Sequence, residues 1–112
     1  MREQRSTKAV FDKLIKREDA ARVKVVEIAI GEISELDQNI IQQHWGVLCK
    51  DTPLEHAKLR FRLISGEAQC MACFKKYHPL NGKIHCPHCG SFGAKILSGE
   101  EFYVEHIETD TE

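Results

Sequence analysis

Two Cys-x-x-Cys pairs are the residues of this sequence whose types and spacing point most clearly to chemistry. Cys70 and Cys73 form one pair, Cys86 and Cys89 form the other, and twelve residues separate the pairs. Two cysteines at this spacing place both sulfurs on one tight turn, and two such turns can complete the tetrahedron of a structural zinc ion. The intervening residues include few apolar ones, so a bound metal would have to supply the folding free energy. The pattern therefore predicts a zinc ribbon.

Two other uses of these cysteines are less favoured. Disulfide bonds need an oxidising compartment, and the first 17 residues are charged throughout, without the apolar segment of a signal peptide. A thioredoxin-like redox pair normally occurs once rather than twice. We therefore expect a cytoplasmic protein with reduced, zinc-bound cysteines. His85 and His88 flank the second pair, either as alternative ligands, as residues that tune the site, or as exposed neighbours of a complete four-cysteine shell.

Length and charge exclude several classes of function. The 112 residues are enough for one domain, or for one small domain with a metal-held insert. A net charge of −1 provides no overall basic field for nucleic acid. No apolar run is long enough for a transmembrane helix. The sequence contains no glycine-rich phosphate loop, and its spacing singles out no Ser/His/Asp or Cys/His arrangement. We therefore expect no enzyme, no catalytic residue and no organic cofactor.

The hydrophobic pattern predicts the elements that must position the cysteines. Helical spacing of apolar residues predicts two helices, and alternation predicts three strands. In chain order we expect a helix at about 3–18, a strand at 23–30, a helix from a capping box at 34–37 to about 50, a strand at 59–63, the ribbon at 66–96 and a strand at 101–107. Within the second helix, Trp45 is expected to anchor the core and Cys49 to be a small core residue.

These elements together predict an α/β (α+β) fold. A small three-stranded sheet would be covered by two helices, and the ribbon would be inserted between two of its strands. We expect two domains, one made of residues 1–65 and 97–112 and the other of residues 66–96. Periodicity alone does not decide whether the first two strands run parallel, through a helical crossover, or antiparallel.

Several motifs together resemble the HypA family of nickel metallochaperones, which act in the maturation of [NiFe]-hydrogenase. The segment from Arg22 to Ser34, with its Gly-Glu-Ile-Ser turn, is similar to a strand and turn of that family. The turn from Cys86 to Ser91 and the strand start from Ser98 to Glu101 match further motifs in the same order. The resemblance covers residues 20–108. It implies a structural zinc lobe, a nickel-binding α/β lobe, and two partners: the GTPase HypB and the hydrogenase large-subunit precursor.

The chain departs from the family at its first residues. HypA-like proteins begin Met-His-Glu, and the resemblance implies that nickel is held there by the terminal amine, the imidazole and backbone amides. This chain begins Met1-Arg2-Glu3, so Met1 and Glu3 are the candidate nickel residues that remain. A guanidinium has no lone pair to donate, whereas square-planar nickel(II) favours nitrogen donors. We therefore expect nickel binding at the N-terminus to be weak or absent.

Three alternatives to nickel delivery follow from the same residues. A protein without a nickel site would act as a zinc-ribbon adaptor that scaffolds the assembly machinery. A thiol oxidoreductase is disfavoured because zinc-bound thiolates are already committed. A nucleic-acid-binding ribbon would combine basic and stacking side chains, but the near-zero net charge ranks it lower; its candidate residues are Lys75, Lys76, Lys83, Lys95, Phe74, Tyr77 and Phe92.

Overall fold

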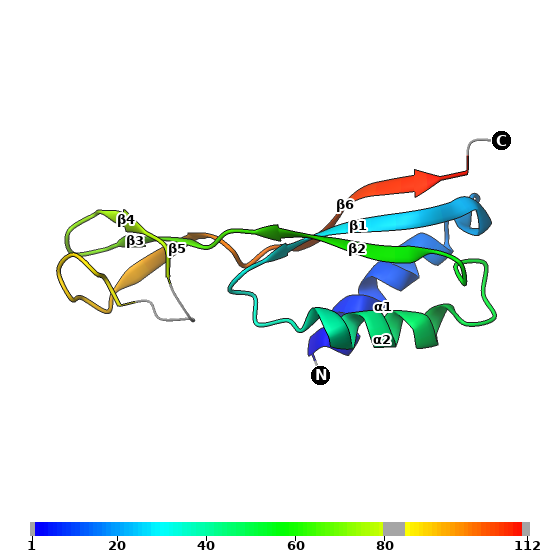
Figure 1. Cartoon of the computed structure of the whole chain (residues 1–112), viewed down its shortest axis with the longest axis horizontal. Helices are drawn as coiled ribbons and strands as arrows, with labels where there is room; N and C mark the ends of the chain where they lie inside the picture. Colours follow the sequence, from blue (N-terminus) through cyan, green and yellow to red (C-terminus); the bar gives the residue numbers. More distant parts are fainter. Residues whose placement is uncertain (1, 80–84, 111–112) are drawn as a thin grey trace. The chain divides into compact units, whose positions relative to one another are not determined.

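The computed structural model describes residues 2–79 and 85–110 (Figure 1). Its helices and strands follow the predicted order. Along the chain these are α1 (Arg2–Ile15), the 3₁₀ helix η1 (Ala20–Arg22), β1 (Val23–Gly31), α2 (Gln38–Cys49), β2 (Lys58–Ile64), β3 (Glu67–Cys70), β4 (Lys76–Tyr77), β5 (Ala94–Ser98) and β6 (Phe102–Thr109).

The chain packs into two compact units. The first comprises Met1–Ala29, Leu36–Arg62 and Phe102–Glu112, and the second comprises Ile30–Glu35 and Leu63–Glu101. The second unit therefore includes residues 30–35, which the predicted domain boundaries place with the helices. None of the described helices is long and apolar enough to cross a membrane.

The first sheet has the strand order β2-β1-β6. β2 runs parallel to β1, so α2 is the crossover between them, and β6 returns antiparallel to β1 (Figure 1). Backbone hydrogen bonds from Gly31 N to Glu101 O (2.7 Å) and from Asp110 N to Arg22 O (2.8 Å) mark the two ends of the antiparallel pair. The two helices and three strands confirm the predicted α/β class and settle the strand direction that periodicity left open.

The core of the first unit lies between this sheet and the two helices. Its buried side chains include Val26 and Ile28 of β1 and Ile41 of α2. Trp45 is also buried; its indole Nε1 donates to Ala57 O at 3.0 Å, and its ring meets Phe11 of α1 edge to face. Trp45 and Cys49 are thus the core residues that the sequence predicts.

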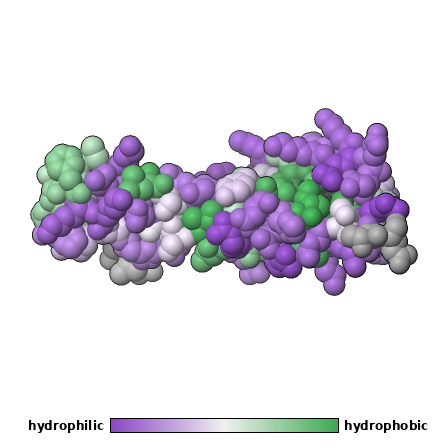
Figure 2. Space-filling model, turned by 90° about the horizontal axis from the view of Figure 1, so that it is seen from above, coloured by the Kyte–Doolittle hydropathy of each residue, from purple (hydrophilic) through white to green (hydrophobic). Residues whose placement is uncertain are grey.

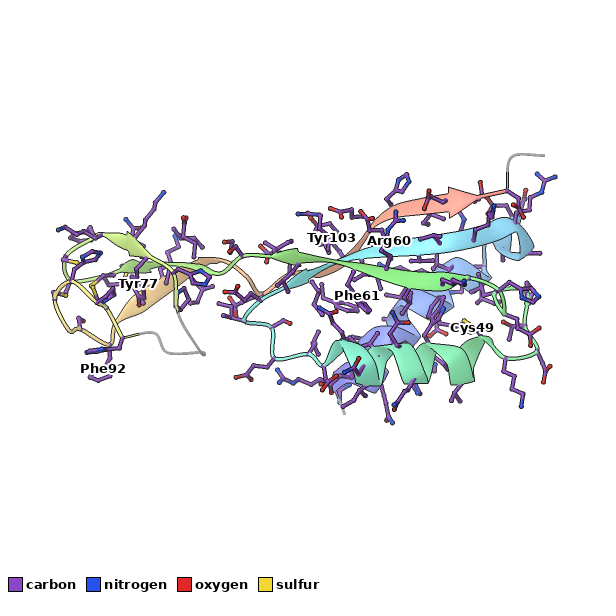
Figure 3. All side chains as sticks on the ribbon, in the orientation of Figure 1. Cys49, Arg60, Phe61, Tyr77, Phe92 and Tyr103 are labelled. Atoms are coloured by element: carbon purple, nitrogen blue, oxygen red, sulfur yellow. The ribbon has the colours of Figure 1, made fainter. Side chains whose placement is uncertain are left out.

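The opposite face of the sheet is charged. Phe61 of β2 points toward the helices, whereas Arg60 and Tyr103 lie on the other side (Figure 3). Arg60 Nε contacts Glu27 Oε2 at 2.8 Å, and an equivalent ion pair joins Arg62 to Glu105. The alternation of Arg60 and Arg62 with apolar residues therefore separates a covered face from a solvated one.

The start of α2 differs from its prediction. Asp37, not Ser34, is the N-cap: its Oδ1 accepts hydrogen bonds from Asn39 N at 2.8 Å and Ile40 N at 3.2 Å. Ser34 instead takes part in the preceding turn, where its backbone N–H donates to Gly31 O. The predicted capping box was wrong because a carboxylate at position 37 already satisfies the first N–H groups of the helix.

The second unit contains its own antiparallel sheet, with the order β4-β3-β5. Ala68 of β3 lies opposite Tyr77 of β4 and Ile96 of β5. Among the described residues, Ala68 and Tyr77 are buried together with Cys70 and Cys86, and the partly buried Cys73, Ala94 and Ile96 pack against them. The small core means that the metal site, rather than apolar packing, must hold the ribbon together.

Candidate metal centre

The two Cys-x-x-Cys segments fold into matching turns. In each, the N–H of the first cysteine donates to the carbonyl five residues later, and its carbonyl accepts from the N–H four residues later. These bonds join Cys70 N to Lys75 O (3.0 Å), Phe74 N to Cys70 O (2.9 Å), Cys86 N to Ser91 O (2.9 Å) and Gly90 N to Cys86 O (3.0 Å). The repeated pattern places the sulfurs of both pairs in equivalent positions.

The four sulfurs meet in one cluster and fit a tetrahedral zinc ion. All four lie within 4.8 Å of one another. The Sγ atoms of Cys70 and Cys89 are 3.5 Å apart, and those of Cys73 and Cys86 are 3.7 Å apart. Zinc–sulfur bonds of about 2.3 Å in a tetrahedron place the sulfurs about 3.8 Å from one another. The observed separations are therefore those of ligands around a single zinc ion.

Backbone N–H groups point at the sulfurs of Cys70 and Cys86 and favour the charged form of these two thiols. Ala72 N and Cys73 N lie 3.3 and 3.4 Å from Cys70 Sγ, and His88 N lies 3.4 Å from Cys86 Sγ. The two donors from Cys73 and Ala72 lower the pKa of the Cys70 thiol to about 6. Because zinc binds thiolates, a lowered pKa reduces the competition between metal and proton.

Burial differs among the four ligands. Cys70 and Cys86 are buried, Cys73 is half-buried and Cys89 is exposed. Tyr77 packs beside them within the ribbon, whereas Phe92 points outward (Figure 3). With four thiolate ligands, no coordination position remains for a substrate, so the site is of the structural type.

Comparison with known proteins gives the family. The family model described as "Hydrogenase/urease nickel incorporation, metallochaperone, hypA" matches residues 1–109. The chain belongs to the HypA family. Among curated relatives, the hydrogenase maturation factor HypA of Geobacter metallireducens is 32% identical over 111 residues, spanning 98% of this chain and all of the relative. The corresponding factor of Caldanaerobacter subterraneus is 29% identical over 114 residues, with the same coverage.

Two solved HypA structures share the fold. The solution structure of the nickel metallochaperone HypA from Helicobacter pylori has a TM-score of 0.66 at 20% identity and covers 98% of each chain. A second solution structure of a HypA protein has a TM-score of 0.61 at 22% identity, covering 93% of this chain and 89% of the other. The relatives therefore extend over both compact units, and the HypA resemblance seen in the sequence is confirmed.

Of the two N-terminal residues that are candidates for nickel, Met1 and Glu3, the structure describes only Glu3. Met1 lies outside the described residues. Glu3 lies in the first turn of α1, where its Oε2 accepts a hydrogen bond from Asp37 N at 3.0 Å. This bond lowers the pKa of the Glu3 carboxyl. Glu3 thus links the start of α1 to the N-cap of α2.

The ribbon histidines stand outside the metal cluster. Within the described residues, the four cysteines form the only group of three or more potential ligands, and neither His85 nor His88 belongs to it. The His85 ring instead stacks against Phe92, with ring centroids 4.8 Å apart. This arrangement supports the interpretation of the two histidines as neighbours of a complete four-cysteine shell.

Sequence analysis missed a histidine with a specific environment. His78 Nδ1 lies 2.8 Å from Gly66 O, and His78 Nε2 lies 3.0 Å from Glu32 Oε1. Both ring nitrogens therefore face oxygen atoms of other residues. The pair ties residues 30–35 to the segment after β4 inside the second unit. Glu32 belongs to the Gly-Glu-Ile-Ser turn, but nothing in the local sequence indicated His78 as its partner.

Proposed function

We propose that this HypA-family protein is a maturation factor for [NiFe]-hydrogenase that holds structural zinc and assists nickel insertion. The observation that carries the proposal is the four-sulfur site on matching turns, in a chain matched by the HypA model over residues 1–109. Bound at Cys70, Cys73, Cys86 and Cys89, zinc would supply folding free energy to the ribbon rather than catalysis. We propose no enzymatic activity, because the four thiolates fill the zinc coordination sphere.

Partners and compartment belong to the same proposal. A HypB-like GTPase would supply the nucleotide hydrolysis, and the hydrogenase large-subunit precursor would receive the metal. Four metal-binding thiolates need a reducing environment, which supports a cytoplasmic location. Nucleic acid is not among the proposed partners.

The proposal has two forms. In one the protein itself binds nickel and hands it over; in the other it scaffolds the assembly machinery without a tight nickel site. Arg2 offers no lone pair, and the Glu3 carboxylate is engaged by Asp37 N. We therefore propose that the N-terminus binds nickel weakly, and that the protein assists nickel insertion by scaffolding the assembly machinery unless another imidazole supplies the missing ligand.

The test is elemental analysis of protein with its native start after equilibrium dialysis against nickel(II). We expect zinc in the wild type with little nickel, and a gain of nickel in Arg2→His, because this change adds the imidazole that suits a square-planar site. Arg2→Gln is the matched control, since it removes the positive charge without adding a ligand. Tight nickel binding by the wild type would contradict the scaffold form of the proposal, and a zinc-free, folded wild type would contradict the proposal as a whole.

A further inference from the structure

The cysteine turns present large apolar side chains to solvent. Met71 and Phe74 belong to the first turn and are 53% and 64% exposed, and Phe92, just after the second turn, is 72% exposed. Met71 N donates to Gly93 O at 2.9 Å, so the first turn lies against the residue that follows Phe92. Figure 2 shows apolar surface at this end of the ribbon. Single exposed apolar residues are ordinary, but three on adjoining turns form a patch that indicates a binding surface.

The backbone conformation of Phe74 costs free energy. Its φ of 63° lies in the left-handed region, and the equivalent position of the second turn is Gly90, with φ of 80°. A residue with a side chain pays roughly 1–2 kcal/mol for that conformation, whereas glycine does not. The exposed phenyl ring obtains little packing within the chain in return. An observed backbone outlier of this kind supports a functional role for the side chain.

The stretch of sequence that carries the patch is basic. Residues 68–99 contain four lysines and three histidines but no aspartate, glutamate or arginine. A zinc ion with four thiolates carries two negative charges, which leaves this stretch about two charges positive with neutral histidines. Lys76 and Lys95 both lie opposite Gln69 in the ribbon sheet, so their side chains share one face with it.

We propose that these residues form a docking surface for an acidic segment of a partner protein that carries apolar anchor side chains. The knuckle surface, defined here as Met71, Phe74, Phe92, Lys76 and Lys95, matches such a segment: the apolar residues would provide affinity and the lysines would select the charge. Nucleic acid fits less well, because a net charge of about two offers few phosphate contacts. This docking surface lies on the ribbon and would act whether or not the protein delivers nickel.

The test uses the full, zinc-loaded chain labelled with nitrogen-15. The probe is a short synthetic peptide of glutamates interrupted by leucines, added at low ionic strength. We expect amide shifts confined to residues 71–76 and 91–95, and binding that weakens as salt is raised. A peptide with glutamine in place of glutamate and a single-stranded oligothymidylate are the comparison probes.

Two variants make the test specific. Phe74→Gly removes the ring and places at this position the residue that the second turn already has, so the turn should keep its fold. It should weaken peptide binding at least about fivefold without reducing zinc affinity. Val47→Ala, at another exposed apolar side chain on α2, should leave binding unchanged. The proposal is overturned by an absence of shifts, by equal binding of Phe74→Gly or of the glutamine peptide, or by tighter binding of the oligonucleotide.

Discussion

Two cysteines of this chain have thiol pKa values that are shifted in opposite directions. Cys70 accepts hydrogen bonds from Ala72 N and Cys73 N, which bring the pKa of its thiol down to about 6. Cys49 is 2% exposed on the buried side of α2, and burial raises the pKa of its thiol to about 11. The two thiols differ because backbone N–H groups point at Cys70, whereas Cys49 is buried away from water.

Burial predicts which cysteines react after metal removal, because Cys49 lies buried in the first unit whereas the four zinc ligands belong to the second unit. With iodoacetamide near neutral pH, we expect all five cysteines of the zinc-loaded protein to be protected. After treatment with a chelator, Cys70, Cys73, Cys86 and Cys89 should become alkylated while Cys49 stays protected, as peptide mass spectrometry would show. Because burial disfavours the Cys49 thiolate, the folded state keeps its stability below the ordinary thiol pKa of 9 and loses stability as pH rises from 9 to about 11. Alkylation of Cys49 at the rate of the other four would show that its burial is not maintained.

At the scale of elements, Asp37 stands at the junction of α1 with α2. Asp37 caps α2 through its carboxylate, and its own N–H donates to Glu3 of α1. We expect Asp37→Ala to lower the free energy of unfolding by about 1 kcal/mol, because the first N–H groups of α2 lose their acceptor. Urea denaturation followed by the fluorescence of Trp45 would measure the change.

Asp37→Asn is the matched control for that prediction. Its amide oxygen can still accept from Asn39 N and Ile40 N, so Asp37→Asn should keep most of the stability that Asp37→Ala loses. Equal destabilisation by both variants would mean that the charge near the helix start, rather than the hydrogen-bonding geometry, provides the effect.

Local patterns predicted the longer elements and failed on the shorter ones. The alternation of Val26, Ile28 and Ile30 located β1, because one side of that strand faces a core. The first helix ends at Ile15 rather than near residue 18, although the charged residues that follow are compatible with helix; there Arg17 pairs with Asp19 in the turn before η1. β4 has two residues, too few for any period to register.

Other features depend on residues far apart in the chain, which no local pattern can reveal. A Cβ atom on Gly31 would lie 1.9 Å from Gly99 O, and one on Gly99, whose φ is 109°, would lie 2.7 Å from Gly66 Cα. The three glycines thus allow three chain segments to pass in contact. The pairing of Glu32 with His78 lies in the same unit and escaped prediction for the same reason. The four cysteines were predictable because metal ligation imposes its spacing on the sequence itself.

At the scale of the whole molecule, the two compact units are stabilised by different means. The first has a core of large aliphatic side chains around Trp45, with Ile28, Ile41 and Leu54 almost completely buried. In the second, the buried cluster of Ala68 and Tyr77 includes two of the metal ligands. Hydrophobic burial can support the first unit alone, whereas the second needs the free energy of zinc binding, about 10–16 kcal/mol for structural sites in small zinc domains.

We therefore expect zinc removal to unfold one unit and spare the other. On addition of a chelator, the amide resonances of the ribbon strands should collapse toward unfolded positions, while the helical circular dichroism and the fluorescence of Trp45 persist. Cys86→Ser should produce the same partly folded state without chelator, because it removes a buried ligand. Loss of the helical signal together with the ribbon would show instead that the units fold cooperatively. In that case zinc would stabilise the helices and the three-stranded sheet as well, and any loss of partner binding after zinc removal could not be assigned to the knuckle surface alone.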